Sequence, residues 1–306
     1  MKENSGRSSI NRKYETFWPI FFLAPFFVCF LVLNIFPIFY SFFISLTDWT
    51  GISEKKFIGF QNYIDIIAND INFRKSIGNT FYLVLIANSI MLIFGLLLAN
   101  FLFGLKLGRT VFQTINFLPY VTAPVALGLI FRFLFDWKYG TINKILISIG
   151  ISSEGINWFG TPQAAQWVII ILLIWKHVGY YMVIFLAGLS SVPGELYEAA
   201  IVDGAGKPAV FFHITIPLLR PVLTFAGVTS LIGGLQIFDE PYMMYPMSYG
   251  GPKNSVLTVV WHFYVSAFRN QFRMGYGAAV AFLLFIIIVI IAGISTRLIG
   301  GKGEEA

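Results

Sequence analysis

The sequence has little charge and almost no cysteine. Of its 306 residues only 12% are Asp, Glu, Lys or Arg, well below the roughly one quarter found in soluble domains, and 57% are hydrophobic. The single cysteine, Cys29, excludes an internal disulfide and a thiol-based metal cluster. The three histidines, His177, His213 and His262, fall in separate segments and predict neither a metal cage nor a Cys/His pair. This composition favours a membrane protein without a metal or another cofactor.

Patterns for binding nucleotides and nucleic acids are missing as well. No Gly-x-x-x-x-Gly-Lys-Ser/Thr loop occurs, and Gly206-Lys207-Pro208 cannot replace it, because proline lacks the backbone N–H that an anion cradle needs. The net charge of +6 is not gathered into a basic stripe with interleaved aromatic residues. Membrane lipid headgroups explain the scattered cations better than nucleic acid does. We therefore expect that any ATP hydrolysis belongs to another subunit.

Six apolar segments are long enough to cross a bilayer. A spanning helix needs about 20 residues, and lipid offers the backbone no hydrogen-bond partner outside a helix. The segments are Phe17 to Leu46, Ile77 to Phe103, Val111 to Phe135, Ala164 to Ala187, Val222 to Phe238 and Met274 to Arg297. The fold class predicted is an all-α membrane protein with six transmembrane helices.

The first segment also bears on processing and orientation. Its uncharged run from Thr16 to Thr47 is far longer than the roughly 7 to 15 residues of a cleavable signal core, so we expect an uncleaved span. Six spans place both termini on one side, and the short turn 104–110 carries Lys106 and Arg109 without an acid. Since cytoplasmic loops are rich in Lys and Arg, we expect cytoplasmic tails at 1–16 and 299–306 around a membrane domain at 17–298.

Two segments between the expected spans have an apolar and a polar face. They are Phe60 to Ile67, which leads towards Phe73-Arg74-Lys75, and Trp261 to Phe272. Such patterns are typical of amphipathic helices that lie at the membrane surface.

Residues 193–217 form a polar insert between the fourth and fifth spans. Pro193-Gly194 interrupts the chain, and the helix-forming residues 195–202 predict a short helix. The run 203–206, Asp-Gly-Ala-Gly, predicts a turn, and Pro208 fits the start of a second helix, where its missing N–H has no consequence. We expect a helix-turn-helix on the cytoplasmic face. Composition alone favours a plain connector of two spans that lies on the surface.

The spacing within this insert resembles the EAA loop of ABC importer membrane subunits. Glu198-Ala199-Ala200 precedes Gly204 by six residues counted from Glu198, Ile214 follows ten later, and Pro217 ends the insert. Other stretches resemble, in order, the carbohydrate-type subset that includes maltose and glycerol-phosphate transporters. They are Phe57 to Tyr63, Asn79-Thr80, Trp175 to Met182, Leu186 to Leu189 and Gly250-Gly251-Pro252. Ser190 to Pro193 departs from the more polar, glutamine-bearing family version.

This resemblance implies the type I permease fold of ABC importers, in a bacterial inner membrane. It implies a transport subunit, not an enzyme, that moves a carbohydrate, first of all an oligosaccharide, by alternating access. The implied partners are a second similar permease subunit, two ATP-binding subunits and an extracytoplasmic solute-binding protein. The residues implied to contact the ATPase are Glu198, Ala199, Ala200, Asp203, Gly204, Ile214 and Pro217.

Alternatives remain within and outside this class. The solute of an ABC permease can also be a polyol or a glycerol phosphate. A secondary transporter would show paired acids or broken helices near the midplane, and a membrane-embedded enzyme would show convergent catalytic groups within the spans. The sequence displays neither.

Four polar or aromatic residues within the spans are candidates for the solute pathway. Lys176 lies near the centre of the fourth span, where a charge costs at least a few kcal/mol. It either contacts solute or makes a hydrogen bond that holds helices together, and both interpretations stay open. Tyr180 is four residues on, so it shares a face with Lys176 and offers a ring to a sugar. Asn88 and Gln236 are the other candidates, for solute contact or for helix packing.

Overall fold

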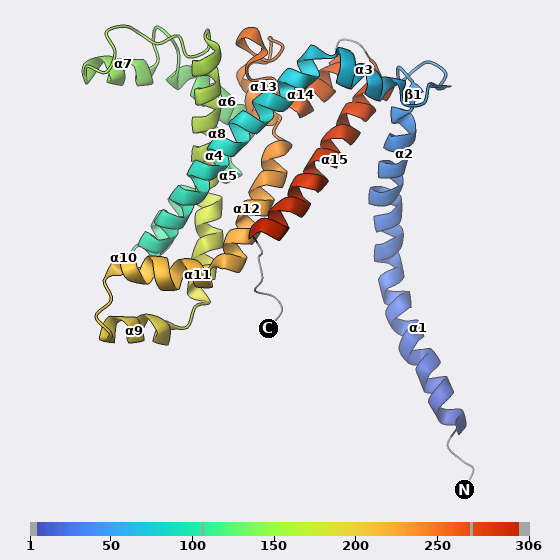
Figure 1. Cartoon of the computed structure of the whole chain (residues 1–306), viewed down its shortest axis with the longest axis horizontal. Coiled ribbons are helices and arrows are strands. Elements are labelled where there is room, and N and C mark those ends of the chain that lie inside the picture. The colour runs from blue at the N-terminus through green and yellow to red at the C-terminus, as the bar shows by residue number, and fades with distance from the viewer. Residues whose placement is uncertain (1–4, 106, 270–271, 300–306) are drawn as a thin grey trace.

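The protein is a bundle of long helices, seen in a computed structural model that describes residues 5–105, 107–269 and 272–299 (Figure 1). The predictions for residues 1–4 and 300–306 of the two tails, and for Lys106, lie outside this range. Two short strands, β1 (Thr47–Asp48) and β2 (Lys56–Phe57), pair antiparallel beyond the end of α2. The helices up to the fourth span are α1 (Ser5–Phe30), η1 (Leu31–Ile35), α2 (Phe36–Ser45), α3 (Gln61–Asn69), α4 (Ile71–Phe103), α5 (Arg109–Val121), α6 (Pro124–Leu134) and α7 (Thr141–Ser148). The later ones are α8 (Pro162–Ser190), α9 (Gly194–Val202), α10 (Lys207–Val210), η2 (Phe211–Thr215), α11 (Ile216–Leu218), α12 (Arg220–Leu235), α13 (Asp239–Met244), η3 (Pro252–Asn254), α14 (Val259–Tyr264), η4 (Val265–Arg269) and α15 (Met274–Ile299).

Four helical segments are long and apolar enough to cross a membrane unbroken, within the part of the chain that the structure describes. They are Trp18–Ser45, Ile71–Phe103, Pro162–Ser190 and Met274–Arg297. Two more spans are present if each of two bent helix pairs counts as one, which gives six. The predicted all-α membrane fold is therefore confirmed.

The third predicted span is not one helix. Helices α5 and α6 meet at an angle of 97° where a continuous helix from Val111 to Phe135 was expected. Ala123 precedes Pro124, and its ψ of 132° is extended, because the proline ring clashes with a helical residue before it. The segment Lys207–Leu218 likewise meets α12 at 69°. The sequence-based view that no helix is broken was wrong, so the argument against a secondary transporter cannot rest on it.

The core is built around α4 and α8, and α5 packs against α8. At Gly179 of α8, a Cβ atom would lie 1.8 Å from the backbone oxygen of Asn116 in α5. Only glycine permits this approach, because any side chain would push the two helices apart. The first span stands to one side and contacts the rest through α2 and α15 (Figure 1).

Two of the quoted motifs tie loops to helix ends. The Asn62 amide donates to the carbonyls of Ser45 (2.9 Å) and Thr47 (3.0 Å), which fixes α3 to the end of α2. The Asn79 amide donates to the carbonyl of Leu257 at 3.0 Å, which fixes the loop after Gly-Gly-Pro to α4. These asparagines have structural partners, since buried backbone carbonyls need donors.

The two expected surface helices both pack one side against the protein. Helix α3 covers most of the first segment, and its Ile66 side chain is buried. In the second, Trp261 is 0% exposed and His262 is 4% exposed. The position of both segments at the membrane surface stays a prediction.

Candidate functional site

A cavity of about 470 Å³ lies between α4, α5, α8, α12 and α13. Its volume is within the roughly 300 to 1,000 Å³ of small-molecule sites. Three of the four predicted pathway residues line it, namely Asn88, Tyr180 and Gln236. The other lining residues are Val84, Met91, Tyr120, Leu173, His177, Tyr181, Thr229, Ser230, Gly233, Gly234, Ile237, Phe238, Asp239 and Glu240.

Lys176, the fourth predicted residue, does not line the cavity and forms an ion pair with a residue that does. Its Nζ lies 2.5 Å from Oε1 of Glu240, and the two side chains are only 11% and 8% exposed. A charge within a span normally faces a partner of opposite sign. The geometry favours the interpretation of Lys176 as a group that holds helices together, here α8 and α13. The sequence placed Glu240 at the end of the fifth span and gave no signal that joins two residues 64 positions apart.

Aromatic rings cover one wall of the cavity. The rings of Tyr120 and Tyr180 are stacked, with centroids 4.5 Å apart and planes at 20°. His177 meets Tyr120 edge-on at 5.8 Å, and its Nδ1 lies 3.0 Å from the carbonyl oxygen of Leu173. Since a carbonyl only accepts, Nδ1 carries the hydrogen and Nε2 of neutral His177 is an acceptor. Sequence reasoning found Tyr180 but missed Tyr120, which the packing of α5 on α8 brings alongside it.

Asn88 and Gln236 differ in their hydrogen bonding. Asn88 is 7% exposed, and its Nδ2 has no hydrogen-bond partner within the described residues. Gln236 lies just past the end of α12, and its Nε2 donates to the carbonyl of Ile232 at 3.1 Å. A buried amide donor without a partner costs about 1 to 3 kcal/mol, which makes Asn88 the stronger candidate for a bond to a solute.

The insert 193–217 folds as two short helices with a tight turn. Gly204 has a φ of +77°, the left-handed conformation that glycine adopts without strain. The Ala205 N–H donates to the carbonyl of Ala200 (2.9 Å), and the Gly204 N–H donates to that of Ile201 (3.0 Å). This pair of bonds is a Schellman motif, which ends α9 at Asp203. Turn and helices lie where the sequence predicts them.

The predicted contact residues are distributed over two faces of this insert. Glu198, Ala199, Asp203 and Gly204 are exposed, Ala200 faces the protein, and Ile214 and Pro217 are half-buried. The insert lies at one end of the bundle, beyond the spans (Figure 1). It presents large apolar side chains there, with Ile201 69%, Val202 86% and Phe212 62% exposed.

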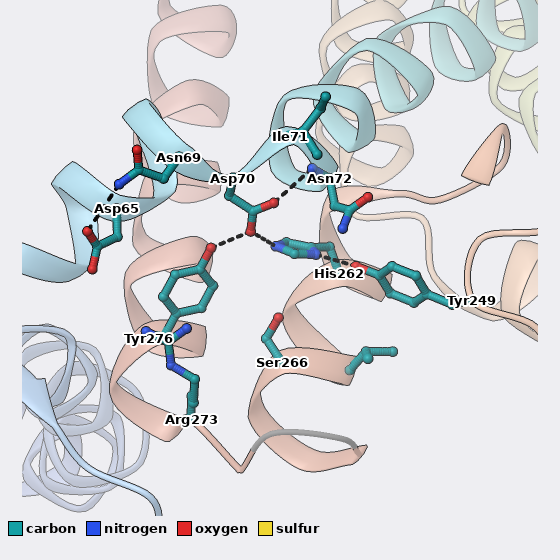
Figure 2. Close-up of a pocket in the computed structure, with 11 residues that line it drawn as sticks. Asp65, Asn69, Asp70, Ile71, Asn72, Tyr249, His262, Ser266, Arg273 and Tyr276 are labelled. Atoms are coloured by element: carbon teal, nitrogen blue, oxygen red, sulfur yellow. Dashed lines mark hydrogen bonds and ion pairs between the residues drawn. The ribbon is translucent and has the colours of Figure 1, made fainter. Parts of the chain in front are cut away.

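A second polar cluster lies at the opposite end of the bundle (Figure 2). It lines a hollow of about 490 Å³. The carboxylate of Asp70 accepts the backbone N–H of Phe73 at 3.0 Å, lies 3.0 Å from Nε2 of His262, and accepts the hydroxyl of Tyr276. Tyr249 completes the chain, with its hydroxyl 2.6 Å from Nδ1 of His262. Sequence reasoning missed this cluster, because its members, Asp70, Tyr249, His262 and Tyr276, come from four separate segments.

The electrostatics of Asp70 follow from these contacts. Burial raises the pKa of this carboxyl, but the hydrogen bonds from His262, Tyr276 and Phe73 outweigh it and hold the pKa well below its usual range. Asp70 therefore stays ionised and fixes the start of α4 to α14 and α15. We assign this cluster a structural role.

Comparison with known proteins decides the family. Residues 91–301 match the family of the "binding-protein-dependent transport system inner membrane component". The chain belongs to this family. The predicted relationship to ABC importer permeases is thereby confirmed, and the protein is a multi-pass membrane protein.

Relatives of known role are similar over nearly the whole chain. The arabinooligosaccharides transport system permease protein AraP of Bacillus subtilis is 35% identical over 94% of this chain and 90% of its own length. The lactose transport system permease protein LacF of Rhizobium radiobacter is 35% identical over 94% of this chain and 95% of its own length. In fold, a bacterial ABC transporter that imports the acidic polysaccharide alginate has a similar chain, with a TM-score of 0.81, 21% identity, and coverage of 95% of this chain and 98% of that one.

Proposed function

We propose that this permease forms half of the transmembrane pathway of an ATP-driven importer for a carbohydrate, with an oligosaccharide as the first expectation. A second similar permease subunit supplies the other half, two ATP-binding subunits contact the α9–α10 insert, and an extracytoplasmic solute-binding protein delivers the solute. The membrane is the bacterial inner membrane, and both termini face the cytoplasm.

The observation that carries the proposal is the exposed apolar surface of the insert. Ile201, Val202 and Phe212 lie outside the spans, where water is the alternative to a protein partner. Ala199 is exposed on the same helix and lets a partner backbone approach closely. An apolar helix in a groove of the ATPase explains this surface.

The insert is joined to two of the helices that line the cavity, α4 and α12. Tyr197 of α9 packs against Phe103 at the end of α4, with ring centroids 6.1 Å apart. Leu219, between α11 and α12, is 1% exposed in the core. A displacement of α9 by the closing ATPase dimer therefore acts on α4 and α12, the helices of Asn88 and Thr229. These packing contacts would transmit movement of the insert to the helices around the cavity, as alternating access requires.

Groups suited to a sugar line the cavity. Tyrosine rings offer flat apolar faces to a pyranose, and the hydroxyls and amides around them bind its hydroxyl groups. AraP and LacF, named for arabinooligosaccharides and lactose, support the same solute class.

The test replaces two glycines of the same turn. Gly204→Val forces a β-branched residue to a φ of +77°, which costs more than the roughly 1 to 2 kcal/mol of an ordinary residue there. Gly206→Val is the matched control, because Gly206 has φ −71° and ψ 158°, a conformation that valine favours. No atom lies within 4 Å of a Cβ at Gly204, so the strain is in the backbone alone.

We expect Gly204→Val, like Glu198→Lys, to abolish carbohydrate uptake by cells that contain the full transporter, with normal amounts of inserted permease. Gly206→Val should transport normally. The ATPase should fail to co-purify with the Gly204 variant, or should hydrolyse ATP without uptake. Normal uptake by both Gly204→Val and Glu198→Lys would refute the assignment of the insert.

A further inference from the structure

The ionisable side chains that line the cavity are acidic, apart from His177 and three tyrosines. Asp239 and Glu240 are both in the lining, and no Lys or Arg lines it within the described residues. The nearby cation, Lys176, is engaged by Glu240 at 2.5 Å. This pair is neutral as a whole and leaves no free positive charge for a solute.

Asp239 remains as an uncompensated charge. Its side chain is exposed, and no hydrogen-bond or ion-pair partner for it occurs in the part of the chain that the structure describes. A carboxylate at the exposed edge of the cavity repels an anion over several ångströms, although water and salt weaken this repulsion. The cavity therefore repels an anionic solute.

The hydrogen-bonding groups of the lining point the same way. Thr229 donates its hydroxyl hydrogen to the carbonyl of Phe225 at 2.7 Å, and Ser230 donates to that of Gly227 at 2.9 Å. The Gln236 amide donates to Ile232 at 3.1 Å. Thr229 and Ser230 also hydrogen-bond the hydroxyl of Tyr181, so the side-chain oxygen of Gln236 is the acceptor among these groups that remains open to a solute.

The donors that the lining offers to a solute are uncharged. They are the unpartnered Nδ2 of Asn88, the second N–H of the Gln236 amide and the hydroxyls of the tyrosines. A carboxylate or phosphate accepts hydrogen bonds only and is bound best by charged donors or a cation. A sugar hydroxyl donates and accepts, and it suits a lining of uncharged donors and acceptors.

We infer that the pathway selects uncharged, hydroxyl-rich solutes and rejects sugars that bear carboxylates or phosphates, with Asp239 as the residue that sets this preference. The inference rests on the proposed function and narrows it. It disfavours glycerol phosphate as the solute, and it separates this chain from the alginate transporter, whose fold it shares and whose named solute is an acidic polysaccharide.

The experiment compares matched sugars on the complete permease–ATPase complex in nanodiscs. A panel of neutral trisaccharides is titrated by calorimetry alongside the counterparts in which each CH₂OH group is oxidised to a carboxylate. For each pair that binds, we expect the neutral member to bind at least about tenfold tighter, since like charges disfavour the other. Asp239→Asn should reduce this ratio several-fold, and Asp239→Lys should reverse it.

Asp48→Asn is the control, because it removes an equal charge from an exposed position in β1, away from the cavity. The ratio of the affinities for the neutral and the oxidised sugar should be the same in Asp48→Asn as in the unmodified complex. Equal or tighter binding of the oxidised sugars, or an unchanged ratio in both Asp239 variants, overturns the inference while leaving the importer function intact. Binding of a non-sugar solute and of no sugar in the panel overturns the proposed function itself, and the inference with it.

Discussion

The ion pair between Lys176 and Glu240 leads to the most decisive prediction. Both side chains are about nine-tenths buried, so removing one partner leaves the other charged and unpaired. Such a change costs about 3 to 5 kcal/mol. We expect Lys176→Met and Glu240→Met each to lower the thermal midpoint of the purified complex by roughly 5 to 10 °C, taking about 2 °C per kcal/mol for a chain of this size.

The double variant separates a structural role from a solute contact. Replacing both partners by apolar groups of similar shape is nearly neutral, because no unpaired charge remains. We therefore expect the double variant Lys176→Met with Glu240→Met to have a thermal midpoint and a complex yield close to those of the unmodified complex. Uptake should recover in parallel if Lys176 only holds α8 to α13.

Differential scanning fluorimetry and uptake, measured on the same four proteins, complete the cycle. Single variants with unchanged midpoints would show that the pair is not formed in the membrane. A double variant that is stable but transports nothing would return Lys176 to the solute pathway. Either result would refute the reasoning from geometry.

Two further predictions concern the opposite end of the bundle and the orientation of the chain. Folding lowers the pKa of Asp70, so the stabilisation by its carboxylate is complete above its ordinary pKa of about 4 and is lost as the pH falls through the lowered value. The difference in thermal midpoint between the unmodified protein and Asp70→Asn should therefore shrink from pH 6 to pH 3. A constant difference would contradict this prediction. Single cysteines at the exposed positions Ser53, Ser153 and Ser248, in a Cys29→Ala background, should react with an impermeant maleimide from outside the cell, and one at Ser8 should not. Labelling of Ser8 from outside would invert the topology.

The sequence was sufficient wherever local chemistry decides the structure. Apolar length identified the spans, and the Asp-Gly-Ala-Gly run predicted the turn, because Gly204 alone accepts a φ of +77° without cost. The first span runs from Trp18 to Ser45, close to the expected Phe17 to Leu46. The second helix begins at Ile71, earlier than expected, because Asp70 caps it by accepting the N–H groups of Asn72 and Phe73.

What the sequence could not give depends on contacts between distant segments. The break in the third span was missed, because the apolar run continues through it and hydropathy does not reveal a bend of 97°. The sequence indicated only that Glu240 lies at the end of a span, because no local pattern links it to Lys176. Tyr120 gained its place beside Tyr180 only through the fold. The cavity is thus an outcome of helix packing, in which aromatic and acidic residues from four segments converge.

Tyr197 provides a final test of how the insert acts on the spans, because its ring packs on Phe103 while its neighbour Leu196 is 43% exposed. The hydroxyl of Tyr197 is buried and has no hydrogen-bond partner within the described residues. We therefore expect Tyr197→Phe to keep full uptake, whereas Tyr197→Ala should keep the ATPase bound and lower uptake several-fold, with ATP hydrolysis no longer stimulated by solute. Leu196→Ala should instead weaken co-purification of the ATPase, since that side chain faces outward. Equal damage from the Phe and Ala variants of Tyr197 would mean that the hydroxyl, not the ring, makes the contact that transmits movement from α9 to α4.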